Sequence, residues 1–253
     1  MTRVVGALLL ASTVLGAQTG SGPAADAPLP DARPFLAAVA AQLARSQDAQ
    51  RDLAYTERRT ELNLNPFGRI GTGGTRVYRV TPASEFPGFT RRLLEKDGRP
   101  VSNAPLERVQ RRAGGNGRRI VDDVAATLDL HLDRREQVDG RTVVVAVFTP
   151  RHNAQPQTRQ GRIARAFKGA IWIDEGTRDV MRVEAEAIDD ISFGFGMVAR
   201  VNRGATVAVA QVPFEDGLWL PASVHFLGEG RAMLFRKLKL DFLVQWSDYQ
   251  RDR

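Results

Sequence analysis

The sequence predicts a mainly β fold in which an antiparallel sheet of roughly nine or ten strands curls into a barrel or half-barrel. Three observations lead to this prediction. Apolar and polar residues alternate with a period of two through most of the chain after residue 53, which is the pattern of half-buried strands. Turns that contain glycine, proline or Asp-Gly separate the alternating segments. Segments with helical periodicity are few, so a long sheet has to cover itself by curling.

The first residues have the features of a secretory signal peptide. Arg3 supplies a basic start, residues 4–15 are mostly apolar, and the small residues Gly16 and Ala17 follow. We therefore expect a cleavable signal peptide over residues 1–17. The apolar run is shorter than a bilayer-spanning helix requires; an uncleaved N-terminal anchor is the alternative interpretation.

The chain contains no cysteine. Neither a disulfide nor a lipid-modified cysteine can therefore form, and an oxidising compartment would leave the protein unchanged. Together with the export signal, this predicts a periplasmic protein without a lipid anchor.

The formal net charge of the chain is +7. A nucleic-acid-binding domain would show clustered basic residues with interleaved aromatic residues, and the densest basic run, residues 108–119, contains no aromatic residue. We therefore expect no nucleic-acid partner. Two interpretations of the charge stay open, transient contact with anionic lipid headgroups and solubility alone.

A flexible linker and a helix are expected to precede the sheet. Residues 18–33 are rich in Ala, Pro, Gly and Ser, which is typical of a linker. Pro34 suits a helix start, and a helix is predicted over residues 34–50 because apolar side chains recur on one stripe. The members of that stripe are Phe35, Leu36, Val39, Ala40 and Leu43. Residues 34–253 are expected to form a single β-domain.

Strands, turns and one small helix are predicted in order along this domain. The strand ranges are 56–64, 75–81, 89–96, 128–133, 141–149, a hairpin over 167–188, 205–214, 218–227 and 231–247. A short charged helix is expected at residues 105–112, a loop at 114–117 and a polar loop at 151–162.

The hairpin at residues 169–184 is the clearest single element. Ile171 and Ile173 point to one face and Trp172 to the other, and residues 174–178 form a polar turn. On the returning strand Met181 and Val183 alternate with charged residues, so one face of the hairpin is expected to be buried.

The last predicted strand alternates in the same way over a longer distance. Its apolar face consists of Leu234, Leu238, Leu240, Phe242, Val244 and Trp246, whereas Lys237, Lys239, Asp241 and Gln245 face away. Such a strand buries one side and exposes the other to water.

Motifs of known catalytic chemistry are missing from the sequence. It has no nucleophile elbow, P-loop, dinucleotide fingerprint or zinc-binding helix signature. The three histidines, His131, His152 and His225, share no ligand spacing, so no metal and no cofactor are expected. The carboxylate doublets at 122–123 and 189–190 would point to opposite faces of a strand. The sequence therefore predicts that the protein is not an enzyme.

One loop carries unusually apolar residues. Ile191, Phe193, Phe195 and Met197 occur among glycines between predicted strands. Two interpretations stay open, a flexible apolar lip over a cavity or at a membrane surface, and a short buried helix or plug.

These features together resemble the LolA/LolB/RseB superfamily. The resemblance is carried by the signal, the Ala-rich helix, the charged meander, and Trp172-Ile173-Asp174 followed by Thr177; the stretch from Asp189 to Gly194 is similar to a poorly characterised bacterial branch. This superfamily includes outer-membrane lipoprotein-sorting proteins of the periplasm and related lipid-binding domains. The resemblance implies an unclosed antiparallel β-barrel of roughly 9–11 strands, with an N-terminal helix and a small inserted helix covering its concave face. It also implies a monomeric carrier or sensor without catalysis.

An acyl chain requires a continuous apolar surface, because each CH₂ group removed from water contributes about 0.8 kcal/mol. The candidate lining consists of Ile171, Ile173, Met181, Val183, Leu238, Leu240, Phe242 and Val244 from the sheet, and Leu36, Val39 and Leu43 from the helix. Ile191, Phe193, Phe195 and Met197 are the candidate lip. Every one of these residues can also serve as ordinary core.

The sequence thus favours a carrier that holds lipid or lipoprotein acyl chains. A sensory or scaffolding domain that binds another envelope protein is the alternative; it would use the polar face with Arg182, Glu184, Lys237 and Lys239. A hydrolase is the third hypothesis and would require converging carboxylates or a Ser–His pair.

Overall fold

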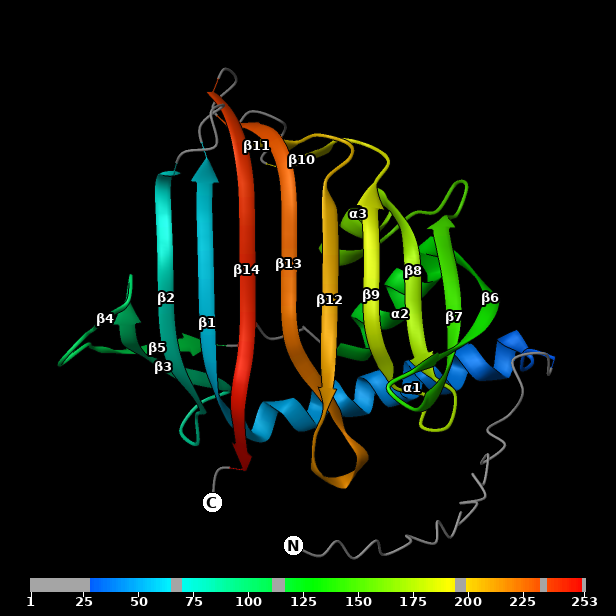
Figure 1. The fold of residues 1–253 in the computed structure, drawn as a ribbon, viewed down its shortest axis with the longest axis horizontal. Coiled ribbons are helices and arrows are strands. Elements are labelled where there is room, and N and C mark those ends of the chain that lie inside the picture. The colour runs from blue at the N-terminus through cyan, green and yellow to red at the C-terminus, as the bar shows by residue number, and fades with distance from the viewer. Residues whose placement is uncertain (1–27, 65–69, 111–116, 194–198, 233–235, 252–253) are drawn as a thin grey trace, which may run out of the picture.

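The computed structural model describes residues 28–64, 70–110, 117–193, 199–232 and 236–251. The predicted signal peptide, residues 1–17, and residues 18–27 of the predicted linker lie outside this range. Within it the chain forms one antiparallel sheet of 14 strands, with helices on one of its faces (Figure 1). The predicted mainly β, unclosed architecture is confirmed.

The strands follow one another mostly as a meander. Their bounds are β1 Leu53–Leu64, β2 Ile70–Pro82, β3 Gly88–Lys96, β4 Arg99–Pro100, β5 Leu106–Gln110, β6 Leu128–Val138, β7 Arg141–Pro150, β8 Phe167–Asp174, β9 Val180–Ala187, β10 Ile191–Phe193, β11 Ala199–Val201, β12 Thr206–Pro213, β13 Trp219–Ala232 and β14 Arg236–Arg251. The order across the sheet is β4-β3-β2-β1-β14-β13-β12-β9-β8-β7-β6, while β5 pairs with β3, β10 with β11, and β11 with β13. Because β1 pairs with β14, the first and last long strands lie side by side in the middle of the sheet.

In the described part of the chain, three α-helices accompany the sheet. They are α1 Ala32–Ala49, α2 Gly117–Thr127 and α3 Arg159–Ala164, and the short 3₁₀ turns are η1 Gln50–Asp52 and η2 Glu215–Gly217. We call the face of the sheet that carries the helices the inner face and the opposite one the outer face. None of the helices in the described ranges combines the length and the apolarity that crossing a bilayer demands.

Helix α1 begins two residues before the predicted start. Asp31 is its N-cap, and its Oδ1 accepts a hydrogen bond from the backbone N of Arg33 at 3.3 Å. Pro34 therefore lies in the first turn, where its missing N–H has no intrahelical acceptor to lose. The predicted linker correspondingly ends before Ala32.

The predicted helix at residues 105–112 is wrong, because residues 106–110 form strand β5. This segment pairs with β3, and Arg91 Nε donates to Glu107 Oε2 at 2.6 Å across the pair. The local sequence of residues 106–110 favours a helix. Pairing with β3 instead provides hydrogen-bond partners for the backbone N–H and C=O groups of this segment. The inserted helices are instead α2, which was not predicted, and α3, which begins inside the predicted loop at 151–162. Gly117 begins α2, and the rest of the predicted loop at 114–117 lies outside the described residues.

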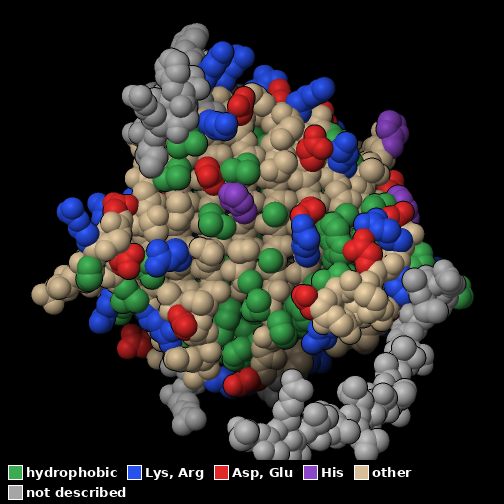
Figure 2. All heavy atoms as spheres, in the orientation of Figure 1, with side chains coloured by type: hydrophobic (Ala, Val, Ile, Leu, Met, Phe, Trp, Pro, Cys, Tyr) green, Lys and Arg blue, Asp and Glu red, His purple; other side chains and the backbone are tan. Residues whose placement is uncertain are grey.

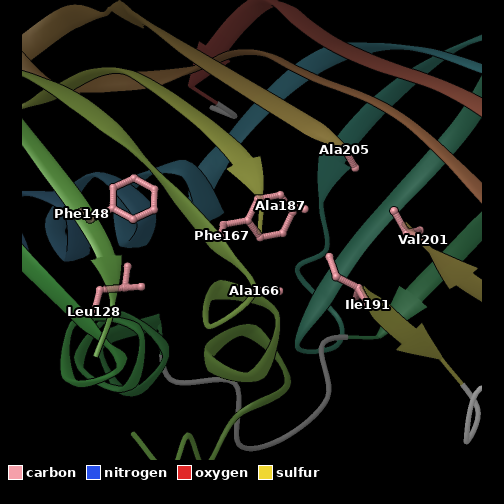
Figure 3. Close-up of a cluster of buried hydrophobic side chains, with 8 residues drawn as sticks. All are labelled: Leu128, Phe148, Ala166, Phe167, Ala187, Ile191, Val201 and Ala205. Atoms are coloured by element: carbon pink, nitrogen blue, oxygen red, sulfur yellow. The ribbon is translucent and has the colours of Figure 1, made fainter. Parts of the chain in front are cut away.

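Among the residues that the structure describes, two buried clusters join the helices to the inner face. One connects β6 to β9 with the segments around α2 and α3, and its members are Leu128, Phe148, Ala166, Phe167, Ala187, Ile191, Val201 and Ala205 (Figure 3). In the other, Phe35 and Val39 of α1 pack on Val144, Ala146, Ile173 and Val180. Helices α1, α2 and α3 thus cover the β6–β9 part of the inner face, and the burial of apolar side chains between helices and sheet stabilises this arrangement.

A β-bulge interrupts the hairpin of β8 and β9. Trp172 pairs with Arg182, whereas the next residue, Ile173, pairs with Val180, so that Met181 is the extra residue. A bulge changes which side chains share a face. Val180 is buried with Ile173 under α1. Regular alternation along β9 would place Val180 on the face opposite to Val183, whereas the bulge places both on the inner face.

Candidate functional site

Asp174 organises the turn of the β8–β9 hairpin. Its Oδ1 accepts hydrogen bonds from the backbone N of Gly176 at 2.8 Å and of Thr177 at 2.9 Å, and its Oδ2 accepts one from Arg141 Nη1 at 2.8 Å. Burial alone would raise the pKa of Asp174, but the hydrogen bonds from Thr177, Arg141 and Gly176 outweigh it and hold this pKa below its usual value. The turn is therefore fixed by an ionised, almost fully buried carboxylate.

The same turn holds α1 in place. The Arg178 guanidinium lies 4.7 Å from the centre of the Phe35 ring, and Asp179 Oδ1 accepts a hydrogen bond from Gln42 Nε2 at 2.9 Å. Asp179 is only 2% exposed, so its contact with α1 is removed from water. The hairpin turn thus fixes α1 across the β7–β9 part of the inner face.

A bidentate ion pair adds a second attachment near the start of α1. Arg135 of β6 donates to both carboxylate oxygens of Glu175 at 2.7 Å, and its Nη2 also donates to the carbonyl oxygen of Pro28 at 3.2 Å. The hydrogen bond from Arg135 is the main cause that lowers the pKa of Glu175 below its usual value. The segment before α1 is therefore tied to the same turn.

The predicted lining residues fall into separate environments. Ile173 and Val39 are buried in the cluster under α1, and Ile171, Val183 and Leu36 are half-buried against it. Met181 and Leu43 are half-buried as well. The structure therefore brings Ile171, Ile173 and Val183 of the predicted sheet lining together beside α1. That any of these residues binds a ligand stays a prediction.

A second group of predicted lining residues lies on β14. Phe242 and Val244 stand opposite Phe226 and Val224 of β13, and those two face Val207 and Val209 of β12. Leu240 is half-buried beside the first cluster, Val244 is buried, and the side chain of Leu238 lies outside the described residues. The residues of this region that keep partial exposure are Val207, Val209, Val224, Phe226, Leu240 and Phe242. We call these six residues the inner apolar patch.

Four residues of the inner apolar patch were not predicted as lining. Val207, Val209, Val224 and Phe226 belong to strands that the sequence predicts, and Val207 and Val209 alternate with Thr206 and Ala208. Alternation alone could have placed them on one face, but only the strand order shows that this face adjoins β14.

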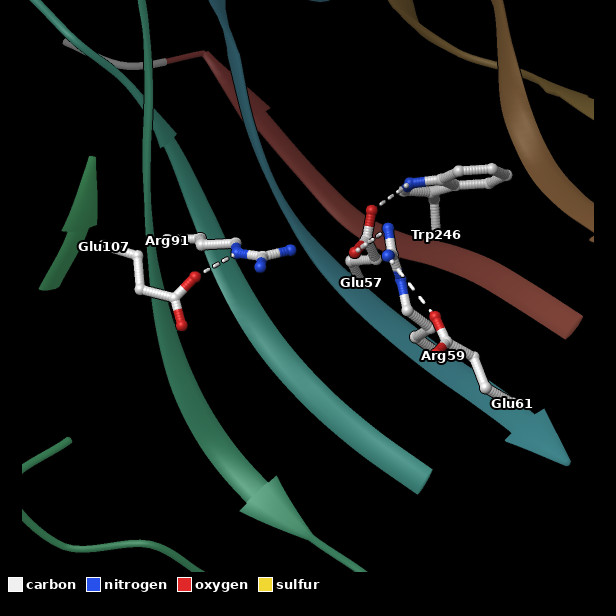
Figure 4. A network of polar contacts seen from close by, with 6 residues as sticks. All are labelled: Glu57, Arg59, Glu61, Arg91, Glu107 and Trp246. Carbon is white, nitrogen blue, oxygen red and sulfur yellow. Dashed lines mark hydrogen bonds and ion pairs between the residues drawn. The ribbon is translucent and has the colours of Figure 1, made fainter. Parts of the chain in front are cut away.

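Beyond β14 the inner face becomes charged. Glu57 of β1 is 8% exposed; it accepts a hydrogen bond from Trp246 Nε1 at 3.2 Å and pairs with Arg59 at 3.1 Å (Figure 4). Arg59 also lies 3.5 Å from Glu61 and 6.0 Å from the centre of the Phe242 ring. Charged side chains therefore adjoin the inner apolar patch directly.

The charged region extends to β3 and β5. Arg91 donates to Glu107 at 2.6 Å and lies 4.6 Å from the centre of the Tyr78 ring. The sequence did not show which of these charged side chains face inward, because charged residues occupy successive positions of β1 and hydrophobic periodicity then does not distinguish the two sides.

The candidate lip is only partly described. Ile191 is buried in the first cluster with Ala187 and Val201. Phe193 ends β10, but its side chain, together with Phe195 and Met197, lies outside the described residues. The predicted lip therefore stays a prediction.

The carboxylate doublets have structural partners. Asp123 lies on α2 rather than on a strand, and it accepts hydrogen bonds from the backbone N of Gln157 and from the backbone N and Oγ1 of Thr158, the N-cap of α3. The hydrogen bond from the Thr158 hydroxyl is the largest cause that lowers the pKa of Asp123. Asp190 accepts from the backbone N of Arg203 at 2.7 Å and pairs with Arg200. Both carboxylates therefore connect chain segments.

The histidines lie apart from one another. His131 and His152 are exposed, and His225 of β13 is 2.9 Å from Asp241 of β14. Within the described ranges no three His, Asp or Glu side chains are grouped as a metal site would need.

The outer face has a shallow groove over the middle of the sheet, with a volume of about 720 Å³. Figure 2 shows this face of the molecule. Small residues such as Ala170 and Ala208 line the groove together with Trp172. Trp172 Nε1 donates to Glu136 at 3.0 Å, and the Arg182 guanidinium lies 5.0 Å from its ring centre.

Comparison with known proteins gives distant likenesses only. No protein-family model matches the chain, and no curated protein matches it either. Among solved structures the chain is similar to a LolA superfamily protein from Nitrosomonas europaea, with 13% identity and a TM-score of 0.34 over 85% of this chain and 94% of that one. It is also similar to a DUF1329 family protein from Desulfovibrio piger (15% identity, TM-score 0.34, 87% of this chain and 93% of that one). A third is an outer membrane lipoprotein-sorting protein domain from Vibrio parahaemolyticus (12% identity, TM-score 0.33, 83% and 92%). These descriptions agree with the resemblance inferred from the sequence. The description of the fold is based on the strand order and register of this chain.

Proposed function

We propose that the protein is a periplasmic binding or carrier protein that holds the acyl chains of a lipid or lipoprotein on the inner apolar patch. Outer-membrane lipoprotein sorting is the process in which such a carrier would act. The observation that supports this proposal is the patch itself, where aliphatic and aromatic side chains on three neighbouring strands keep partial exposure beside a fully buried core.

The physical argument concerns how this patch is covered. Phe226 and Phe242 face each other across β13 and β14 and remain half-buried, whereas Ile173 under α1 is 0% exposed. An acyl chain on the patch would remove apolar surface from water on both partners, at about 25 cal/mol per Å². Helix α1 is held by the β8–β9 turn, so we propose that it forms one border of the site rather than a freely moving lid.

The proposed site residues follow from this arrangement. The inner apolar patch supplies Leu240 and Phe242 of the predicted lining, while Ile171, Val183 and Leu36 would extend the surface toward α1. Ile173, Val39 and Val244 support it from the core. We propose that the protein is monomeric and has no catalytic role. We also propose that residues 1–17 direct its export and are then cleaved, and that the mature protein makes transient contact with the membrane surface.

Native mass spectrometry of protein purified from its own cell envelope tests the proposal. Co-purifying lipid or acylated peptide is expected, as is uptake of a fluorescent fatty acid by the ligand-free protein. Phe226→Asp on the inner face is expected to weaken uptake at least tenfold, because it places a charge where the acyl chain would lie. The matched control is Leu227→Asp, which changes the next residue, a 42% exposed side chain on the outer face. Protein that carries no ligand and takes up no fatty acid would contradict the carrier role.

A second candidate function is binding of another envelope protein at the outer face. The groove beside Trp172 and Glu184 is the observation in its favour, and Lys237 and Lys239 are exposed on the same sheet. Crosslinking in cells would then yield a stable protein partner, and Trp172→Ala would abolish that crosslink without changing fatty-acid uptake.

A further inference from the structure

We infer that the amphiphile bound on the inner apolar patch carries an anionic group, and that this group lies on a row of cations formed by Arg59, Arg76 and Lys96. This inference rests on the proposed function and adds the chemistry of the ligand's polar end. The shared chemistry is a carboxylate or phosphate attached to an acyl chain.

Strand register places the three cations in one row. Val244 of β14 stands opposite Arg59 of β1, Arg59 opposite Arg76 of β2, and Arg76 opposite Lys96 of β3. Directly opposed residues of antiparallel strands point to the same face, with Cβ atoms about 5 Å apart. Because Arg59 contacts Phe242 and Glu57 on the inner face, the register assigns Arg76 and Lys96 to that face too.

The charges along this row are not balanced. Arg59 has Glu57 and Glu61 as partners. By contrast, the side chains of Arg76 and Lys96 have neither an ion pair nor a hydrogen bond in the described part of the chain. Like charges directly opposite each other destabilise a sheet, so an unmatched pair of cations is a cost that a bound anion would remove.

Arg59 offers an additional donor. Its Nε is buried and has no hydrogen-bond partner among the described residues. A buried N–H without an acceptor costs free energy, and a carboxylate or phosphate oxygen would satisfy it. A guanidinium fork also matches the planar geometry of a carboxylate or two oxygens of a phosphate.

The cationic row and the inner apolar patch form one continuous surface. Val244 is the next member of the row, and the Arg59 guanidinium lies 6.0 Å from the Phe242 ring centre. From Arg76 on β2 to Phe226 on β13 the distance is three strand spacings, or about 14 Å. A ligand with an anionic end on β2 would therefore lay its chain across β14 and β13.

Binding of a fluorescent fatty acid and of its methyl ester, which has the same chain without the charge, tests this inference at low ionic strength. The acid is expected to bind roughly 10- to 100-fold more tightly, as a charge-assisted hydrogen bond would give. Arg76→Gln is expected to remove most of that difference by weakening the acid alone, while Arg76→Lys retains part of it. The matched control is Arg58→Gln, because Arg58 neighbours Arg59 but pairs with Glu95 away from the inner face.

The outcomes separate this inference from the carrier proposal. Equal binding of acid and ester, unchanged in Arg76→Gln, overturns the anionic site and leaves the carrier intact. Failure of both ligands to bind contradicts the carrier itself. A third arm of the experiment titrates the protein with inorganic phosphate alone. If phosphate binds and Arg76→Gln abolishes this binding, while the acid and the ester bind equally, the cationic row binds a free anion and the inference is overturned.

Discussion

Arg178, in the turn between β8 and β9, lies over the ring of Phe35 on α1, with its guanidinium 4.7 Å from the ring centre. The backbone of Arg178 has a positive φ of 68°, a conformation that costs free energy for a residue with a side chain. The contact with α1 is one feature that offsets this cost. The hairpin turn is therefore the structural link between the sheet and the helix that borders the candidate site.

Phe35→Ala tests that link. The Phe35 side chain is 3% exposed and packs in the cluster with Ile173, so its truncation is expected to lower the free energy of unfolding by about 3–5 kcal/mol. Urea denaturation followed by circular dichroism measures this change. Ala37→Ser, at an exposed position of the same helix, is the control and is expected to change stability by about 0.5 kcal/mol or less. A loss below about 1 kcal/mol in Phe35→Ala would show that α1 is weakly attached.

Stability is expected to fall in acid, with Asp174 as a contributor. Its folded-state pKa is lowered, and an unfolded aspartate titrates near about 3.9. The unfolded state therefore binds more protons below that pH, and the stabilisation is present above about pH 4 and lost as the pH falls through the folded-state pKa. Urea unfolding at a series of pH values measures the slope. Asp174→Asn should flatten the acid limb, and an unchanged slope would contradict the proposed role of this carboxylate.

Asp123 is expected to hold α2 against the start of α3. It accepts hydrogen bonds from the backbone N of Gln157 and of Thr158, both at 2.8 Å. Asp123→Ala removes both acceptors, so amide hydrogen exchange at these two positions is expected to accelerate while the β8–β9 hairpin keeps its protection. Unchanged protection at Gln157 and Thr158 would show that these amides are shielded by something other than Asp123.

Gly169 is expected to resist substitution. A Cβ at this position would lie 2.0 Å from the carbonyl oxygen of Glu184 on the neighbouring strand, and backbone atoms in a sheet cannot easily move away. Gly169→Ala should therefore lower the free energy of unfolding by about 1–3 kcal/mol. Gly176→Ala in the adjacent turn is the comparison, because its nearest neighbour is a side-chain oxygen at 3.3 Å. Equal, small effects of the two substitutions would contradict the close approach of β8 and β9.

Much of the sheet is predictable from alternation, and the exceptions have physical causes. A period of two predicts which face Ile171, Ile173 and Val183 occupy. The bulge at Met181 brings Val180 under α1, and the apolar–polar alternation of the sequence does not reveal where a bulge occurs. Residues 106–110 were assigned to a helix because their local pattern favours one, while pairing with β3 decides the outcome.

The candidate site is less predictable than the fold, because it depends on strand order. The inner apolar patch combines Val207, Phe226 and Phe242 from β12, β13 and β14, which follow one another in the chain. The cationic row lies on three successive strands, β1, β2 and β3, and only the pairing of β1 with β14 brings this row beside the patch. The pairing of β1 with β14 joins segments far apart in the sequence, and alternation within one strand does not encode it.

Photo-crosslinking with a fatty acid that carries a diazirine on its chain tests the central claim most directly. Adducts mapped by mass spectrometry are expected on the inner apolar patch, at residues such as Val224, Phe226 and Phe242, whose side chains are half-buried on the inner face. Adducts confined to Trp172 and Leu227 in the outer groove, with the inner face unlabelled, would contradict an acyl-chain site on the inner face.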